Sequence, residues 1–375
     1  MSDNFLQAYA ELLDFIANHP EIEIGESVTS IPEDVRPDFY ARFNSARNVF
    51  VEEKFPEYLS KSRRLQEEYY KAIDDAAGLL SPEDAPEINR LRRYLRDPKE
   101  SLARELFDPL FDLLKKRETP DSFEKRASAG ICELFPVVYR GGYEKWVILG
   151  LANLLEAEKA LRVPVRELQP GDRAKSAAYA PMEEVPSPME SSAFFFSQPA
   201  KAIFAVPDFI IRSAKLNRFI GIRSEFKEGI YNALNASHER EWYPVDVDLL
   251  ILLASGLTLV YVDERPERVS LIADASKFCR PDLLLWCVDT QAVSRKEALG
   301  KMAIADLRLR PSRGSFIAAN DSWPESGDPD ELRALNEQMR GEASRIRVLT
   351  VGFDCLQLSP VIEALCDAEG SAITT

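Results

Sequence analysis

The sequence predicts a helical N-terminal region followed by an α/β domain built on a mixed sheet. Three observations carry this prediction. Apolar residues recur at helical spacing over residues 1–162, a proline-rich stretch follows, and short β-rich runs dominate after residue 200. Because several of these runs alternate with helix-like segments, we expect parallel and antiparallel strands within one sheet.

Size and composition indicate an ordinary globular protein of two domains. The chain has 375 residues, more than one compact core usually takes, and 45% of them are hydrophobic and 29% charged. Its net charge of −15 argues against a protein that coats nucleic acid without specificity. There is no apolar run of about 20 residues and no basic segment before an apolar N-terminal stretch. We therefore expect a cytoplasmic protein without membrane contacts.

Cysteine and histidine usage narrows the possible metal chemistry. The five cysteines are scattered, odd in number and without CxxC spacing, which favours reduced, buried thiols. The two histidines, His19 and His238, are too few for a His-rich zinc site. A bound metal ion would therefore be held mainly by oxygen ligands.

Helical periodicity divides the N-terminal region into several segments. We expect helices over residues 4–19, over residues 38–80 with a break near Pro56, and over residues 123–139 and 143–161, which Gly141-Gly142 separates. Residues 1–162 are thus predicted to form a helical domain.

The composition changes at residue 163. Residues 163–199 contain six prolines with glycine and serine between them, which predicts a linker. Residues 200–375 are predicted to form the α/β domain. Its candidate strands are 202–211, 218–226, 258–263, 282–288, 315–319 and 345–353.

The first two candidate strands predict a hairpin with one polar face. With a turn at residues 216–217, Lys215 lies opposite Arg218 and Asp208 lies opposite Glu225. Two carboxylates about 5 Å apart repel each other unless a cation or a shared proton lies between them. Five charged residues of the ribbon fall on the same face: Asp208, Arg212, Arg223, Glu225 and Lys227.

This face has the residue types of a hydrolytic metal site. A carboxylate pair suits a hard divalent cation such as Mg²⁺ or Mn²⁺, which keeps some waters and contacts phosphate oxygens. Asp208 and Glu225 are therefore the candidate metal ligands. Lys227 could orient or deprotonate a water beside the metal, or stabilise developing negative charge. Together these groups predict hydrolysis of phosphodiesters.

The sequence Pro207-Asp208, followed by Glu225-Phe226-Lys227, resembles the motif of the PD-(D/E)xK nuclease superfamily. The match covers residues 200–263 and implies a restriction-endonuclease-like core of a helix, three strands, a second helix and a further strand. The aspartate would lie on the second strand and the acid-x-lysine element on the third. Residues 230–255 would form the second helix and residues 258–263 the last strand.

The resemblance implies Mg²⁺-dependent cleavage of DNA or RNA, with Asp208, Glu225 and Lys227 as the catalytic residues. Proteins built in this way often work in DNA repair or in defence against foreign DNA, which is an analogy. Many members add an acidic residue from the helix before the first strand. The candidates in this sequence are Glu156, Glu158 and Glu190.

The hairpin is also locally basic. Residues 201–227 contain six lysines and arginines but two acidic residues, and binding of a phosphate backbone needs such a patch. The candidate nucleic-acid contacts are Arg212, Lys215, Arg218 and Arg223. The alternative is a solvated hairpin tip without a ligand.

The same residues also allow a second function that needs no metal ion. Arg212 and Arg223 could neutralise the two acids without any metal ion. The chain would then be a non-enzymatic assembly or adaptor subunit with an inactive nuclease-like core or another α/β scaffold. Its long acidic helical region would bind protein partners.

Overall fold

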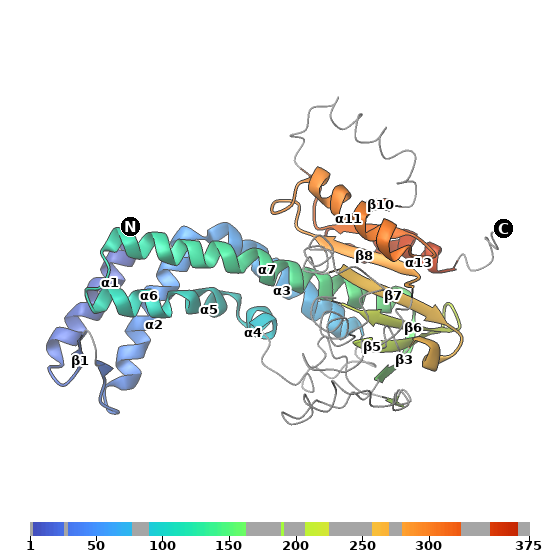
Figure 1. Ribbon diagram of the computed structural model, residues 1–375. Coiled ribbons are helices and arrows are strands. Elements are labelled where there is room, and N and C mark those ends of the chain that lie inside the picture. Colours follow the sequence, from blue (N-terminus) through green and yellow to red (C-terminus); the bar gives the residue numbers. More distant parts are fainter. Residues whose placement is uncertain are drawn as a thin grey trace, which may run out of the picture. The chain divides into compact units, whose positions relative to one another are not determined.

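A computed structural model describes residues 3–25, 29–76, 90–162, 189–190, 207–224, 257–269, 280–323 and 346–366. The chain divides into two compact units, a helical unit of residues 1–70 and 87–142 and a sheet unit of residues 71–86 and 143–375. Figure 1 shows their elements. The helices in the described part are α1 (Asp3–Asn18), α2 (Arg36–Lys54), α3 (Pro56–Asp75), α4 (Arg90–Arg96), α5 (Pro98–Ala103), α6 (Phe107–Leu114), α7 (Pro120–Leu154), α11 (Arg295–Leu309) and α13 (Ser359–Cys366), with 3₁₀ turns η1 (Arg104–Leu106), η2 (Pro266–Val269) and η3 (Cys355–Leu358). The strands are β1 (Glu23–Ile24), β2 (Thr29–Ser30), β3 (Ala157–Arg162), β4 (Met189–Glu190), β5 (Phe209–Ser213), β6 (Arg218–Arg223), β7 (Leu257–Asp263), β8 (Leu283–Val288), β9 (Ser315–Ala319) and β10 (Ile346–Thr350).

Aromatic side chains build the core of the helical unit. Phe5 of α1 packs with its ring centroid 5.4 Å from those of Phe50 and Phe123, and all three side chains are fully buried. The predicted helix over residues 4–19 is confirmed by α1. The predicted break near Pro56 is confirmed as well, because α2 ends at Lys54 and α3 begins at the proline. A residue that precedes proline is disfavoured in the helical conformation, which explains the interruption.

The prediction of two helices over residues 123–161 is wrong in two respects. First, α7 is one continuous helix from Pro120 to Leu154 that passes through both glycines. A Cβ atom on Gly142 would lie 2.8 Å from the Leu65 side chain, so a glycine at this position lets α7 pack closely against Leu65. Second, the helix ends at Leu154, and residues 157–162 form β3 of the sheet after a left-handed turn at Glu156.

The sheet unit contains a mixed sheet of eight strands among the described residues, in the order β10-β9-β8-β7-β6-β5-β3-β4. Strands β8, β9 and β10 are parallel, and every other neighbouring pair is antiparallel. The predicted class, a helical region followed by a mixed-sheet domain, is thereby confirmed. Most of the predicted linker 163–199 lies outside the described residues, but residues 189–190 form β4 at the edge of this sheet.

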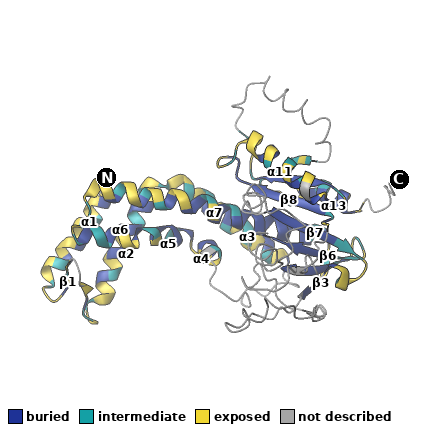
Figure 2. Cartoon of the chain, in the orientation of Figure 1, coloured by how far each residue is buried: buried dark blue, intermediate teal, exposed yellow. Residues whose placement is uncertain are grey.

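Both faces of the sheet are covered. On one face, the α11 side chains of Ala298, Met302 and Ala305 pack against a cluster that includes Ile210 and Trp286. All six residues of β8 are buried, which is typical of a central strand and explains its continuous apolar sequence LLLWCV. The Ser294 hydroxyl caps the N-terminus of α11 by accepting a hydrogen bond from the Glu297 amide. In Figure 2 the strands are mostly buried, and exposed residues concentrate on the outer helices.

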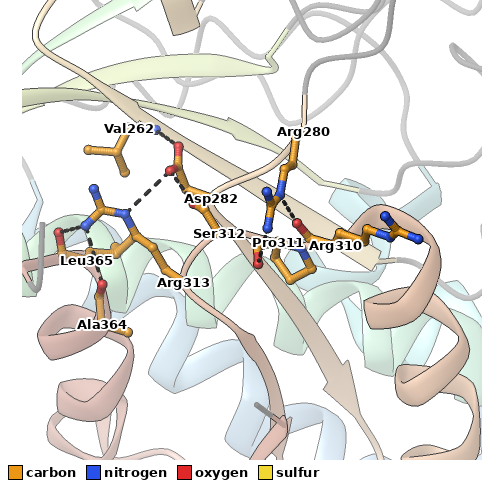
Figure 3. A network of polar contacts seen from close by, with 9 residues as sticks. All are labelled: Val262, Arg280, Asp282, Arg310, Pro311, Ser312, Arg313, Ala364 and Leu365. Carbon is orange, nitrogen blue, oxygen red and sulfur yellow. Dashed lines mark hydrogen bonds and ion pairs between the residues drawn. The ribbon is translucent and has the colours of Figure 1, made fainter. Parts of the chain in front are cut away.

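A polar network holds α13 to the sheet unit (Figure 3). The Asp282 carboxylate accepts hydrogen bonds from the Val262 amide at 2.8 Å and the Ser312 hydroxyl at 2.7 Å. The Arg313 guanidinium lies 3.5 Å from the same carboxylate and donates to the carbonyls of Ala364, at 3.4 Å, and Leu365, at 2.5 Å. These carbonyls belong to the last turn of α13, where a cation is favourable. Arg313 thus joins the start of β9 to the end of the C-terminal helix.

Replacing Arg313 with alanine is expected to destabilise the sheet unit by about 1.5–3 kcal/mol, the usual range for hydrogen bonds made by a charged group. All four tryptophans of the chain lie in this unit, so its urea unfolding can be followed by tryptophan fluorescence. Arg295→Ala, at an exposed position on α11, serves as the control and should change the stability by less than about 0.5 kcal/mol. Equal effects of the two substitutions would contradict the assigned role of Arg313.

Candidate functional site

The β5–β6 hairpin has a different register from the one the sequence predicts. Ser213 pairs with Arg218 and Phe209 pairs with Ile222, so continuing this register places Asp208 opposite Arg223. The predicted pairs of Asp208 with Glu225 and of Lys215 with Arg218 are therefore wrong by two residues. Because the shift is even, each side chain keeps its predicted face of the ribbon.

A four-residue loop causes this shift. Residues 214–217 connect the strands instead of a two-residue turn. A type I′ turn at residues 216–217 would require positive φ at both positions, and Asn217 takes φ 50° whereas a leucine at position 216 resists it. The loop is stabilised by the Ser213 hydroxyl, which accepts a hydrogen bond from the Leu216 amide at 3.1 Å.

Asp208 is buried and held entirely by the end of β6. Its carboxylate Oδ1 accepts from Arg223 Nη1 at 2.9 Å, and Oδ2 accepts from the Ser224 amide at 2.7 Å and hydroxyl at 2.8 Å. The Asp208 amide donates to the Ile222 carbonyl at 2.8 Å. Asp208 is 1% exposed and Arg223 is 7% exposed, so water competes little for this ion pair. Asp208 therefore fixes the backbone at the point where the chain leaves β6 toward Glu225.

Two charged residues from α7 extend this cluster. Lys145 donates from Nζ to the Ser224 hydroxyl at 2.5 Å, and Glu144 accepts at Oε1 from the Thr258 hydroxyl of β7 at 2.6 Å. Lys145 Nζ and Glu144 Oε2 are 3.9 Å apart. The buried polar cluster, as we call it, consists of Glu144, Lys145, Asp208, Arg223, Ser224 and Thr258.

Sequence reasoning missed the α7 members of the buried polar cluster. A usable signal was present, because Glu144 and Lys145 interrupt the otherwise apolar sequence from Tyr143 to Ala152. Every residue of that stretch is buried. A helix that is buried on all sides and still carries adjacent charges needs partners for them, since lysine and glutamate are almost never buried without pairing.

The predicted helix acids do not join this cluster. Glu156 follows α7 at the opposite end of the hairpin, where its carbonyl accepts from the Ala214 amide at 3.1 Å. Glu158 lies on β3 and forms a surface ion pair with Arg212 at 3.6 Å. Glu190 pairs with Leu161 on the outer strand β4. Glu225, Lys227 and the predicted helix over 230–255 lie outside the described residues.

The candidate nucleic-acid contacts separate into two locations. Arg223 is buried against Asp208, whereas Arg212, Lys215 and Arg218 lie at the hairpin tip. Asp208 and Ser213 are five positions apart along the extended chain, which corresponds to about 17 Å. Acidic residues also approach the tip, because Arg218 lies 3.9 Å from Glu264 and Arg212 pairs with Glu158. The exposed basic surface is therefore smaller than the sequence count suggests.

The carboxylate oxygens of Asp208 are of the type that binds a divalent metal ion, but most of their acceptor positions are already used. Carboxylate oxygens are ligands that Mg²⁺ prefers, and a carboxylate offers about four acceptor positions. Three of these positions accept the hydrogen bonds from Arg223 and Ser224. One position on Oδ1 is left for a single metal bond. Within the described residues, no three or more His, Cys, Asp or Glu side chains gather closely enough to hold a metal ion.

Of the helices that the structure describes, none has both the length and the apolar character needed to cross a membrane. Comparisons with protein-family models, with curated proteins and with solved structures found no match.

Proposed function

We propose that the chain hydrolyses phosphodiester bonds of DNA or RNA with the help of Mg²⁺ or Mn²⁺. The observation that carries this proposal is the buried polar cluster at the end of β5 and β6. The cluster contains two ion-paired carboxylates and two cations, all buried. Two of its members, Arg223 and Ser224, directly precede Glu225 in the sequence, and Lys227 follows two positions later. Buried charges of this kind are costly and concentrate at functional sites.

The order of elements around the cluster gives further support. A helix, α7, is followed in the chain by β3, the two-residue edge strand β4, β5 and β6, of which β3, β5 and β6 are antiparallel neighbours in the sheet, with β7 next to β6. The resemblance to the PD-(D/E)xK nucleases implies the aspartate on the second strand and the acid-x-lysine element on the third, and in this chain Asp208 stands one position before β5 and Glu225 two positions beyond the end of β6.

In this proposal each residue has a separate task. Asp208, through its remaining Oδ1 position, and Glu225 hold the metal ion, which when bound supplies charge neutralisation at the phosphate and a water of lowered pKa. Lys227 orients the attacking water or accepts its proton. Lys145, Arg223 and Ser224 hold Asp208 and the end of β6 in place. The phosphate backbone beyond the scissile bond is contacted by Arg212, Lys215 and Arg218. The distance of about 17 Å along the β-strand from Asp208 to the hairpin tip corresponds to about five phosphates of one nucleic-acid strand.

The purified full-length chain is expected to nick supercoiled plasmid DNA or to cleave labelled single-stranded RNA when Mg²⁺ or Mn²⁺ is present. Removal of the metal with EDTA should stop the reaction, and adding excess Mg²⁺ should restore it. Gel electrophoresis of the products measures both effects. Cleavage that EDTA leaves unchanged, or the absence of cleavage of both nucleic acids, contradicts the proposal.

A specific observation favours a second candidate, a non-enzymatic binding subunit. Asp208 already accepts three hydrogen bonds from protein donors and is 1% exposed, an arrangement that serves the fold without a metal ion. Calorimetric titration with Mn²⁺ separates the two candidates. The nuclease proposal expects saturable binding that Glu225→Gln removes, whereas a binding subunit would give no such signal.

A further inference from the structure

Helix α1 has two apolar faces, and one of them is exposed. Phe5, Leu12 and Phe15 point into the helical unit and are at most 9% exposed. A second row, which we call the α1 stripe, consists of Leu6, Ala10, Leu13 and Ala17, all of which are exposed. Leu6 is 43% exposed and Leu13 is 41% exposed. Figure 2 shows how much of α1 is exposed.

The spacing of the α1 stripe is that of a helix-binding surface. Its members are separated by four, three and four residues, so they lie within about 60° of one another around the helix axis. The row from Leu6 to Ala17 is about 17 Å long at a rise of 1.5 Å per residue. A partner helix of about three turns would cover it. Apolar anchors at these intervals are the pattern by which helices recognise one another.

Negative charge borders the α1 stripe. Asp14 is exposed about 40° around the helix axis from the edge of the stripe, and on the same side the uncharged Gln7 and then Glu11 follow at about 60° and 100° from that edge. Eight acidic residues and no lysine or arginine precede Arg36 in the sequence. Arg42 places its guanidinium over the ring of Phe15, on the buried face of α1 and away from the stripe. Any molecule that covers the stripe therefore meets an acidic border.

We propose that the α1 stripe binds an amphipathic helix of another protein, whose apolar side chains are flanked by lysine or arginine. The apolar row supplies contact area, and the acidic border selects the charge of the partner. This interaction is independent of the proposed nuclease activity, because α1 belongs to the helical unit and the buried polar cluster to the sheet unit.

Charge excludes the other occupants of such a face. A second copy of this chain would bring Glu11 and Asp14 against acidic residues of its own kind, which is unfavourable. Anionic lipid surfaces attract basic helices and repel acidic ones. Nucleic acid is excluded for the same reason.

The test uses two fluorescently labelled helical peptides with leucines at positions i, i+4, i+7 and i+11. One peptide has lysines beside the leucines and the other has glutamates. Fluorescence anisotropy should show saturable binding of the lysine peptide to the full-length chain, weakening as salt is raised. The glutamate peptide should not bind.

Variants locate the binding surface. Leu6→Ser combined with Leu13→Ser is expected to weaken binding of the lysine peptide at least about tenfold, because buried apolar anchors dominate such interfaces. Glu11→Gln combined with Asp14→Asn should weaken binding and reduce its salt dependence. The control, Ile304→Ser with Leu307→Ser, removes two exposed apolar residues of α11 and should leave binding unchanged. All changed residues are exposed, so circular dichroism and the melting temperature should stay the same.

Five results would overturn the proposal. In the peptide assay these are equal binding of both peptides, no binding of either, and binding of the lysine peptide that the Leu6 and Leu13 variant retains. The fourth is a dimer in light scattering that this variant converts to a monomer, which would identify a second copy as the occupant. The fifth is binding to phosphatidylcholine–phosphatidylserine vesicles that the variant loses.

Discussion

Glu225→Gln and Lys227→Met are each expected to slow Mg²⁺-dependent cleavage by about 10²–10⁴-fold, the first through loss of a metal ligand and the second through loss of a positioned proton acceptor. The first substitution removes a negative charge that the metal ion requires, with almost no change in shape. The second removes the ammonium group that would orient the water and stabilise the developing charge. Single-turnover cleavage of a labelled substrate measures the chemical step directly.

A neighbouring residue provides a matched control for both substitutions. Glu228→Gln changes the same charge one residue beyond the motif and should leave the cleavage rate within about threefold of wild type, an effect of less than 1 kcal/mol. Tryptophan fluorescence verifies that each variant still folds its sheet unit. If cleavage survives in both Glu225→Gln and Lys227→Met, the activity belongs to other residues.

Lys145→Met should lower the free energy of unfolding of the sheet unit by about 3–5 kcal/mol. Lys145 is 1% exposed, and its ammonium group lies between the Ser224 hydroxyl and the carboxylate of Glu144. Within the buried polar cluster, two cations balance two carboxylates. Removing one cation leaves one negative charge in excess within this buried cluster, although Glu144 still accepts the hydrogen bond from Thr258. Urea unfolding followed by tryptophan fluorescence gives the difference.

The matched control replaces a lysine in an exposed ion pair. Lys301 lies 2.8 Å from Glu297, one helical turn away on α11, and both side chains are at least one-third exposed. Lys301→Met should cost less than about 1 kcal/mol, because water screens the ion pair and the ammonium group lies 5.9 Å from the centre of the Trp286 ring, where an exposed cation–π contact contributes little. Similar losses for Lys145→Met and Lys301→Met would mean that the buried polar cluster contributes little to the stability of the sheet.

The elements with strong local signals could be predicted from the sequence. The run SFIAA coincides with β9, and β7 and β8 lie within one residue of their predicted bounds, because apolar strands between turn residues leave few alternatives. The pair Gly141-Gly142 misled the prediction, since glycine commonly interrupts a helix. Its actual role depends on Leu65, which is distant in the sequence. Strand β3 was missed for a similar reason, because AEKALR has helix-forming residues and becomes a strand by pairing with β5.

The candidate site was accessible to sequence reasoning in part. Asp208 stood out as an acidic residue within the predicted strand 202–211, opposite a second acid in the predicted register, and alternation assigned it to the right face of the ribbon. Its pairing partner depended on the loop length, which the residues 214–217 do not specify through any glycine turn signal. Glu144 and Lys145 could not be connected with Asp208, because Lys145 lies 63 positions before it in the sequence and the two are linked through the Ser224 hydroxyl only by tertiary packing.

Three consecutive residues of α7 make hydrogen bonds to β9, to β7 and to the residue that follows β6. Tyr143 donates to the Ala319 carbonyl at the end of β9 at 3.0 Å, Glu144 accepts from Thr258 in β7, and Lys145 donates to Ser224 beyond β6. Turning the helix by one residue position, about 100°, would break all three contacts at once. We therefore expect the C-terminal turns of α7 to stay fixed to β7, to the end of β9 and to the end of β6.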